Sequence, residues 1–388
     1  MAKKENISSL SIYRALAMLA VLFIHATSEA IAKTKGSDLF FGYNFINTFS
    51  KFAVPSFIML TCFVLFYNYG GRKLDGSMLT GFYRKRLKYI LLPYFICSIC
   101  FFTLIHFTHY PNRELGDTLS SLAIKLLTGS AYTHLYYVFL IIQFYIIFPL
   151  MLLVLRSTRV AAWAIPIGLI LQWGFVIWNK YDLQVTSKGS LLISYASYVM
   201  LGAYLGIYWD RVKGWFQGGI GIDRGRYRLQ TVLLWLSWLT VGLAHVLLWH
   251  ATHLHKARVN TLWYEGLWNV HSLLSCIVLL QAAAYIERKW SSSTVQKISR
   301  FGDMTFGIYL LHPLFLLVYR RFQWHDGDPL LYPLYIAGAF AVALFVTWAV
   351  VALLYRYVKF AWIFFGTGPR PTTVSMAKPD ADGRTLGG

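Results

Sequence analysis

The chain has 388 residues, of which 57% are hydrophobic, 18% aromatic and only 13% charged. Charged residues make up about a quarter of an ordinary soluble domain, so this composition excludes that class. The formal net charge of +20 would suit a protein that binds nucleic acid. However, the basic residues gather in alternate connections between apolar runs, as in membrane proteins, and we expect no nucleic-acid partner.

Apolar runs of about 20 residues recur along the chain, and each ends in a basic or Gly/Pro-containing loop, as bilayer-spanning helices require. The pattern predicts an all-α, polytopic membrane helix bundle with about ten transmembrane helices. We expect residues 1–365 to form a single integral membrane domain. The predicted helices lie at about residues 12–31, 45–67, 87–108, 134–155, 160–178, 190–209, 229–249, 266–286, 303–320 and 330–355.

The distribution of Lys and Arg predicts how the bundle is oriented. With the N-terminus inside, the cytoplasmic segments hold 24 of these residues and the external loops hold 10. Cytoplasmic loops are enriched in Lys and Arg, so the pattern predicts that both termini are cytoplasmic. The polar, Gly/Pro-rich segment 366–388 lacks apolar periodicity and is predicted to be a disordered cytoplasmic tail.

The first predicted helix, "IYRALAMLAVLFIHATSEA" (12–30), carries Arg14 and His25. Eleven residues correspond to three turns plus about 20°, so both side chains share a face and lie about 16 Å apart along the axis. Arg14 is expected near the cytoplasmic headgroups and His25 beyond the midplane. Glu29, at i+4 from His25, can orient the imidazole ring.

Three other interpretations of this segment stay open. Arg14 can extend to lipid phosphates while its stem packs in the bilayer, and His25 can be a helix-packing residue. A cleaved leader is also conceivable, because the uninterrupted apolar run is short and follows two lysines. Since Arg14 adjoins that run, we favour a retained helix.

A basic cluster, "FYRKRLKYILLPYF" (82–95), lies at the predicted cytoplasmic mouth of the third helix. Its cations are Arg84, Lys85, Arg86 and Lys88. Four cations are more than are needed to orient the helix in the membrane. Arginine can hold phosphate through two parallel hydrogen bonds. The cluster therefore predicts binding of a phosphorylated cytoplasmic molecule that extends a thin arm toward His25, with membrane orientation as the alternative explanation.

Polar residues in other predicted helices are weaker candidates for lining a substrate cavity. Lys51 precedes the apolar part of the second helix, His134 opens the fourth, and Tyr309 and His312 are i+3 neighbours in the ninth. Each can equally join helices through hydrogen bonds. The three histidines of "HATHLH" (250–255) have no fixed common face, so no metal site is predicted.

Six stretches match, in order, the landmarks of a known membrane family. Together they resemble the acyltransferase 3 family of integral membrane acyltransferases, over roughly residues 8–360. "RLKYILLPY" and "YLLHP" look most like its single-domain branch, which is similar to poly-N-acetylglucosamine (biofilm polysaccharide) O-acyltransferases. The six stretches are "YRALAMLAVLFIH", "AVPSFIMLTCFVL", "YRKRLKYILLPYF", "HLYYVFLIIQFYIIFPL", "YASYVMLGAYLGIY" and "ISRFGDMTFGIYLLHPLF".

The resemblance implies a multi-pass enzyme of the bacterial plasma membrane. It would move an acyl group, acetyl or succinyl, from cytoplasmic acyl-CoA to a hydroxyl of a cell-surface or lipid-linked polysaccharide. His25 would be the catalytic residue and Arg14 its donor-side partner, while Arg84 and Arg86, with Lys88 beside them, would hold the CoA phosphates. Acyl-CoA is then a donor substrate, no cofactor is bound permanently, and the partners are the bilayer, the glycan and a possible glycan synthase complex.

The sequence departs from the family pattern at two positions. Cys62 stands where the second landmark usually has glycine, and Gln143 stands where another branch of the family often has an acidic residue. We therefore assign Gln143 no acid–base role. His25 is expected to act as a general base oriented by Glu29, or as a nucleophile that forms an acyl-imidazole.

Two other classes of function compete with the enzyme. A polysaccharide exporter or flippase would use the same polar residues to line a path, and broken helices in two matching halves would favour it. A non-catalytic partner of a polysaccharide synthase would use Arg14 and His25 only for packing.

Overall fold

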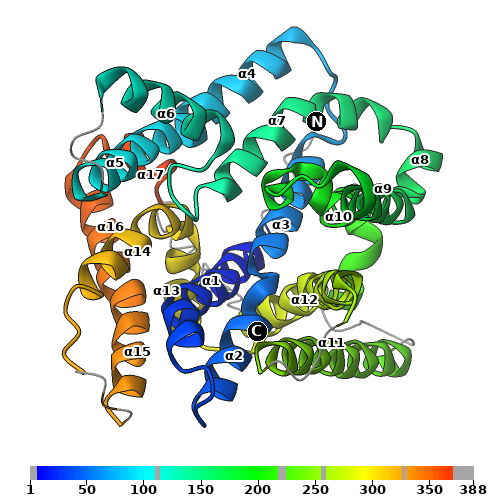
Figure 1. Cartoon of the computed structure of the whole chain (residues 1–388). Coiled ribbons are helices and arrows are strands. Elements are labelled where there is room, and N and C mark those ends of the chain that lie inside the picture. The colour runs from blue at the N-terminus through cyan, green and yellow to red at the C-terminus, as the bar shows by residue number, and fades with distance from the viewer. Residues whose placement is uncertain are drawn as a thin grey trace, which may run out of the picture.

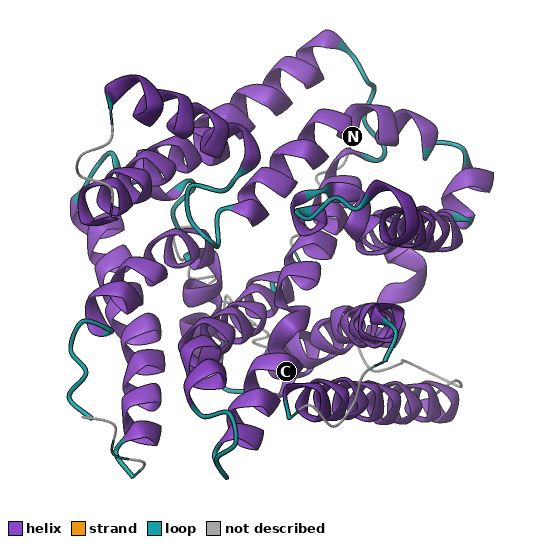
Figure 2. Cartoon of the chain, in the orientation of Figure 1, coloured by secondary structure: helices purple, strands orange, loops and turns teal. Residues whose placement is uncertain are grey.

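The computed structural model describes residues 7–109, 114–216, 224–254, 259–325, 328 and 330–369. Within these ranges every regular element is a helix, as Figure 2 shows. The longer helices are α1 (Ser9–Lys33), α3 (Ala53–Tyr69), α5 (Leu92–His109), α7 (Tyr136–Val154), α9 (Ala164–Trp178), α10 (Ala196–Phe216), α11 (Arg224–His253), α12 (Thr261–Lys289) and α14 (Thr305–Tyr319). The shorter ones are α2 (Phe40–Phe49), α4 (Gly76–Arg86), α6 (Leu115–Thr128), α8 (Thr158–Ala162), α13 (Ser292–Asp303), α15 (Tyr332–Ala341), α16 (Thr347–Tyr357) and α17 (Ala361–Phe365).

Short 3₁₀ and π turns join several of these helices into longer units. The 3₁₀ turn η1 links α2 to α3, and the π turn η2 links α4 to α5. These and the remaining turns are η1 (Ser50–Phe52), η2 (Leu87–Leu91), η3 (Asn179–Leu183), η4 (Lys188–Ser190), η5 (Leu192–Tyr195) and η6 (Val342–Val346).

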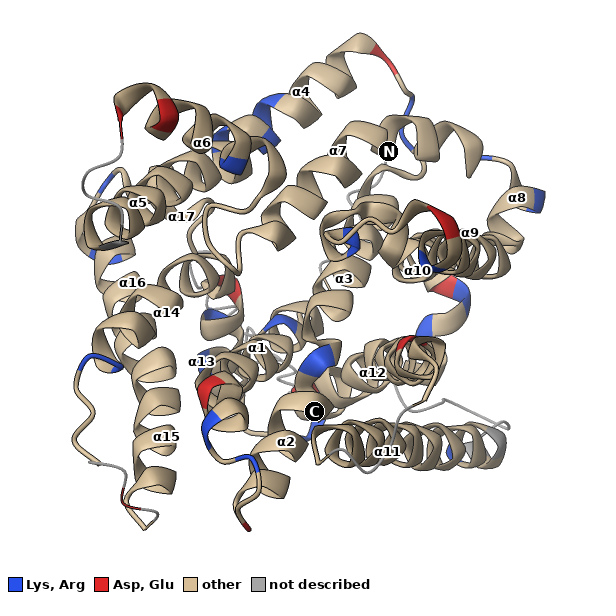
Figure 3. Cartoon of the chain, in the orientation of Figure 1, with Lys and Arg blue, Asp and Glu red and all other residues tan. Residues whose placement is uncertain are grey.

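The prediction of an all-helical membrane protein is confirmed. Eight helices in the described part of the chain are long and apolar enough to cross a bilayer, and the bent pair α13–α14 would make a ninth. Figure 3 accordingly shows a mostly uncharged ribbon. The orientation of the termini stays a prediction, and residues 370–388 of the predicted tail lie outside the described residues.

The number of spans differs from the ten expected, and the reason is helix length. The expected span at 160–178 breaks into α8 and the 15-residue α9. At 1.5 Å per residue, α9 is about 22 Å long, which is shorter than the roughly 30 Å hydrocarbon core. At the expected span 303–320, α14 is bent by 69° relative to α13.

Helix α1 lies at the centre of the bundle, as Figure 1 shows. It packs against α2, α3, α12, α13, α14 and α15. Its buried residues include Ile12, Ala17 and Leu22, each 0% exposed. The helix that carries Arg14 and His25 is therefore the central helix of the fold.

Glycines allow the helices of this core to approach closely. On α10, a Cβ atom at Gly202 would lie 2.3 Å from the Met59 carbonyl oxygen of α3, and one at Gly206 would lie 2.7 Å from the Phe63 carbonyl oxygen. Glycines four residues apart are a common device for close helix contact in membranes, where dispersion forces hold helices together. The spacing in "LGAYLG" thus fixes α10 against α3.

Candidate active site

Three histidines from distant parts of the sequence meet beside α1. The His25 ring lies 4.9 Å from the ring of His312 on α14, edge to face. The His312 ring is in turn 5.9 Å from that of His134, just before α7. The sequence placed these residues in three separate spans, and the structure brings them into one cluster, here called the histidine cluster (His25, His134 and His312).

Hydrogen bonds limit how the cluster can carry protons. His312 is 0% exposed, and its Nδ1 lies 3.1 Å from the Ile308 carbonyl oxygen. A carbonyl only accepts, so Nδ1 carries the proton and Nε2 is left as an acceptor. By geometric criteria, His312 Nε2 and both ring nitrogens of His134 have no hydrogen-bond partner among the described residues. Buried unpartnered nitrogens of this kind suit contact with a substrate or proton transfer.

Tyr309 closes the cluster on its other side. Its ring lies 5.3 Å from the ring of His134 and 6.0 Å from that of His312. Its hydroxyl donates a hydrogen bond to the His134 carbonyl oxygen. Of the substrate-contact candidates, His134, Tyr309 and His312 thus lie together next to His25.

Glu29 is oriented differently from the expectation. Its carboxylate pairs with Lys33 and, at 3.2 Å, with Arg320 Nε. No hydrogen bond joins it to the His25 ring in the described part of the chain. Arg320 also donates from Nη2 to the His25 carbonyl oxygen at 2.6 Å. Glu29 therefore reaches the His25 backbone through Arg320, a residue that sequence reasoning missed because the contact joins the ends of two helices.

Replacing Arg320 tests this arrangement. Arg320→Leu removes a charge-assisted hydrogen bond to the His25 backbone, a class of bond that contributes about 1.5–3 kcal/mol, so we expect the free energy of unfolding to fall by about that amount. Arg321→Leu is the matched control, because Arg321 is the next residue along the chain and its side chain is exposed. Thermal unfolding midpoints of the two purified variants check the prediction, and equal midpoints would contradict it.

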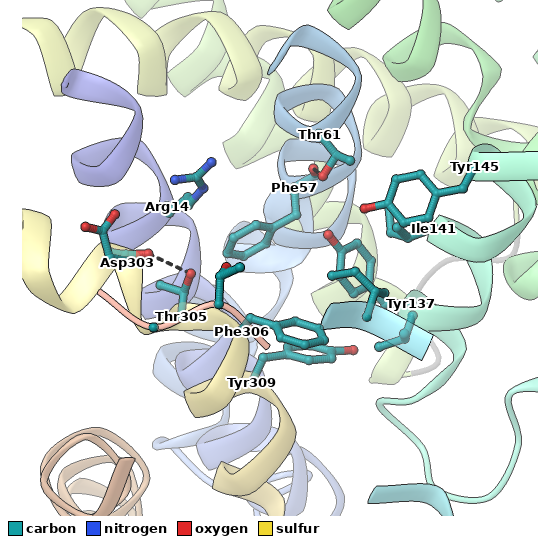
Figure 4. A pocket seen from close by; sticks show the side chains of 15 residues that line it. Arg14, Phe57, Thr61, Tyr137, Ile141, Tyr145, Asp303, Thr305, Phe306 and Tyr309 are labelled. Carbon is teal, nitrogen blue, oxygen red and sulfur yellow. Dashed lines mark hydrogen bonds between the residues drawn. The ribbon is translucent and has the colours of Figure 1, made fainter. Parts of the chain in front are cut away.

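Arg14 lies in a cavity of about 490 Å³ on the side of the bundle where α1 begins. Figure 4 shows Arg14 and Asp303 on one wall and Tyr137 and Tyr145 on the other, with Tyr309 also lining the space. Tyr309 also contacts His134 and His312, so one wall residue of this Arg14 cavity borders the histidine cluster.

The bend between α13 and α14 shapes this wall. Asp303 accepts a hydrogen bond from the Ser11 hydroxyl at 2.6 Å, and Thr305 donates to the Gly302 carbonyl oxygen at 2.9 Å. A Cβ atom at Gly302 would lie 1.8 Å from the Ser11 carbonyl oxygen, so only glycine permits this contact. Asp303 was missed in the sequence, although it is the acidic residue within the landmark "ISRFGDMTFGIYLLHPLF".

The basic cluster is spread over the mouth of the bundle. Arg86 lies over the rings of Phe82 and Tyr145, with its guanidinium 5.1 Å from the Tyr145 centroid, and Tyr145 lines the Arg14 cavity. Lys88 lies 4.2 Å over the ring of Trp362 on α17. Arg84 is exposed. Of the three candidates for phosphate binding, Arg86 is the one that the structure places against the cavity wall.

Lys51 lies apart from the histidine cluster. It belongs to η1 and lines a second cavity of about 250 Å³ with residues of α11 and α12. The predicted substrate contacts thus divide into two groups, one beside His25 and one at this second cavity.

A family model described as an acyltransferase domain matches residues 7–352. The chain belongs to the acyltransferase 3 family. The match spans nearly the whole chain, including α1 with Arg14 and His25 and the entire histidine cluster. The resemblance drawn from the six landmarks is therefore confirmed.

The chain is also similar to proteins of Staphylococcus aureus that are named probable poly-beta-1,6-N-acetyl-D-glucosamine export proteins. The protein of strain MRSA252 is 24% identical over 319 residues, which cover 78% of this chain and 80% of the relative. That of strain MSSA476 is 23% identical with the same coverage. No solved structure matches the chain significantly.

Proposed function

We propose that this protein is a membrane O-acyltransferase. It moves an acyl group, acetyl or succinyl, from cytoplasmic acyl-CoA to a hydroxyl of a cell-surface or lipid-linked glycan. One observation carries the proposal: the Arg14 cavity reaches Tyr309, which contacts both other histidines of the cluster that includes His25. Membership of the acyltransferase 3 family supports the reaction class.

The donor would enter from the basic mouth. Arg84, Arg86 and Lys88 would hold the phosphates of CoA, and the pantetheine arm would lie in the Arg14 cavity. Arg14 and His25 are eleven residues apart on α1, about 16 Å along the axis. That separation suits a thin arm whose phosphate end stays near Arg14 while its thioester reaches His25.

The chemistry proposed for His25 is general base catalysis. A neutral imidazole takes the proton of a sugar hydroxyl as its oxygen attacks the thioester carbonyl; the C–S bond then breaks, and the CoA thiolate accepts the proton. His312 Nε2, an acceptor without a partner among the described residues, would hold the ring proton of His25 and leave the other nitrogen basic.

A nucleophilic variant of this mechanism uses the same residues. His25 would first attack the thioester and carry the acyl group as an acyl-imidazole, which the sugar hydroxyl then cleaves. Incubation with radiolabelled acyl-CoA and no acceptor separates the two mechanisms. Acid-labile label on the protein, absent from His25→Ala, supports the nucleophilic route, whereas unlabelled protein that is still active supports direct transfer.

Release of CoA tests the proposed function. Purified protein in nanodiscs is supplied with acetyl-CoA or succinyl-CoA and a soluble N-acetylglucosamine oligomer, the acceptor class suggested by the names of the relatives. We expect free CoA to appear in proportion to the oligomer added. CoA release that is independent of acceptor for both donors, or absent, would contradict the proposal.

The basic mouth makes a separate kinetic prediction. Arg84→Ala combined with Arg86→Ala is expected to raise the apparent KM for acyl-CoA about tenfold or more, because charge-assisted bonds to phosphate are lost. Lys297→Ala combined with Arg300→Ala removes two exposed cations of α13 and serves as the control for net charge. If the two double variants share the wild-type KM, the residues do not bind the donor.

Export of a glycan is the second candidate function, because the relatives are named export proteins. Among the described residues only one pair of helices, α13–α14, forms a bent span, and paired broken helices in two halves are not seen. Proteoliposomes loaded with the oligomer separate the functions. Loss of oligomer from the lumen without acyl-CoA would favour export over acyl transfer.

A further inference from the structure

The second cavity (about 250 Å³) lies between η1, α11, α12 and the connection that contains Lys188. Phe40, which follows the end of α1, stacks on His250 at the end of α11, and Lys188 pairs with Glu265 at the beginning of α12, so the cavity lies on the side where α1 ends, which is the predicted external side. The cavity combines aromatic walls, from Trp249 and Trp268, with Lys51 and Glu265. It is thus a mixed polar and aromatic space away from the Arg14 cavity.

Two residues that line this cavity, Lys51 and His245, carry nitrogen donors. Lys51 Nζ lies 4.4 Å from the centroid of the Trp249 ring, and in the described part of the chain no carboxylate pairs with it. His245 is 1% exposed, and its Nε2 accepts a hydrogen bond from Trp249 Nε1 at 3.0 Å. The proton of neutral His245 is therefore on Nδ1, which has no partner among the described residues.

The cavity also holds an acceptor at its rim. Glu265 pairs with Lys188 at 2.5 Å, and both side chains stay partly exposed. Donors on one side and a carboxylate on the other suit a ligand with many hydroxyl groups, since each hydroxyl can both donate and accept. Because Glu265 is paired with Lys188, charge alone does not exclude an anionic headgroup; the aromatic walls from Trp249 and Trp268, which a phosphate group does not use, favour a sugar ring.

We infer that this cavity binds one pyranose ring of the acceptor glycan. The C–H face of the ring packs on the indole of Trp249 or Trp268, ring oxygens accept from Lys51 and His245, and a hydroxyl donates to Glu265. Small-molecule sites commonly combine aromatic walls with a few such polar groups. The inference rests on the proposed function, because it takes a glycan as the acceptor.

The cavity is tied mechanically to the segment that carries His25. Asn47 of α2 donates to the Ile24 carbonyl oxygen at 2.9 Å and to the Thr27 hydroxyl at 3.1 Å, on either side of His25. Lys51 follows Asn47 by about one helical turn. A sugar held at Lys51 would therefore be anchored on η1, the turn that continues α2, and α2 is bonded to the stretch of α1 that carries His25.

Calorimetric titration of the protein in nanodiscs with a soluble penta-N-acetylglucosamine tests the inference without acyl-CoA. Lys51→Met and Glu265→Gln are each expected to weaken the Kd about tenfold, as loss of one good polar contact does. Trp249→Leu should weaken it similarly. Trp263→Leu is the matched control, because Trp263 is on the same side of the membrane but 65% exposed.

Each outcome decides one claim. The cavity is supported as a glycan site if the wild-type protein binds the oligomer, the cavity variants weaken that binding and Trp263→Leu does not. This result would hold even if no acyl transfer is found and the proposed function fails. An unchanged Kd in all three cavity variants overturns the inference, while acceptor-dependent CoA release would still support the proposed function. Vesicles of glycerophosphate lipids provide a third test. If these lipids displace the oligomer, and the three cavity variants weaken lipid binding, the cavity binds a lipid headgroup and the inference is overturned.

Discussion

Replacing His25 with alanine is expected to lower acyl transfer to the glycan by about 100- to 10,000-fold, the range that general base catalysis contributes. His25 is the member of the histidine cluster that lies on the central helix α1, and the His312 ring lies 4.9 Å from its imidazole ring. Loss of the ring leaves the sugar hydroxyl without a base. Rates of radiolabelled acyl transfer by purified protein measure the effect.

The control for this variant is His106→Ala. His106 is a histidine of α5 that stacks on Phe102, outside the histidine cluster. We expect it to keep wild-type activity, and we expect both variants to elute as single species from size-exclusion chromatography. A His25→Ala protein that is folded and fully active would remove His25 from the mechanism.

Replacing Gly302 with alanine is expected to give the largest loss of stability. The new Cβ would lie 1.8 Å from the Ser11 carbonyl oxygen, a backbone atom that cannot rotate away as a side chain would, so one helix must move. Overpacking of this kind costs about 1–3 kcal/mol, and displacement of α13 from α1 would also disturb Asp303 and the wall of the Arg14 cavity. Thermal unfolding followed by size-exclusion chromatography should show a clearly lower midpoint.

Gly214→Ala provides the comparison. Gly214 lies in α10, and a Cβ atom there would have no heavy atom within 4 Å. Alanine is favoured over glycine inside a helix by up to about 1 kcal/mol, so this variant should be as stable as wild type or more stable. Equal midpoints for Gly302→Ala and Gly214→Ala would show that α1 and α13 are not held together as described.

The sequence predicted the membrane-spanning helices well where they can be recognised from the length and polarity of a single segment. Apolar runs of about 20 residues locate the spans because a bilayer imposes that length on any helix that crosses it. The short α9 and the bend between α13 and α14 were not predicted. Both depend on tertiary packing, for instance on the close approach of Gly302 to Ser11, which no single segment reveals.

The same division applies to the site. Arg14 and His25 could be singled out because helical phase on one segment relates them. His134 and His312 were noted individually, but their contact with His25 depends on how three helices pack. Arg320 and Asp303 were missed because each acts through a partner on α1. Lys51 was grouped with the polar residues near His25 as a candidate for lining a substrate cavity, although it lines a different cavity.

The most direct test of the proposed acyl transfer is the fate of a labelled acyl group. Protein in nanodiscs is given acetyl-CoA or succinyl-CoA labelled in the acyl group, together with the N-acetylglucosamine oligomer, and the oligomer is then analysed by mass spectrometry. We expect labelled ester on a sugar hydroxyl with wild-type protein and none with His25→Ala. Oligomer that stays unlabelled with both donors, or is labelled equally by His25→Ala, would contradict it.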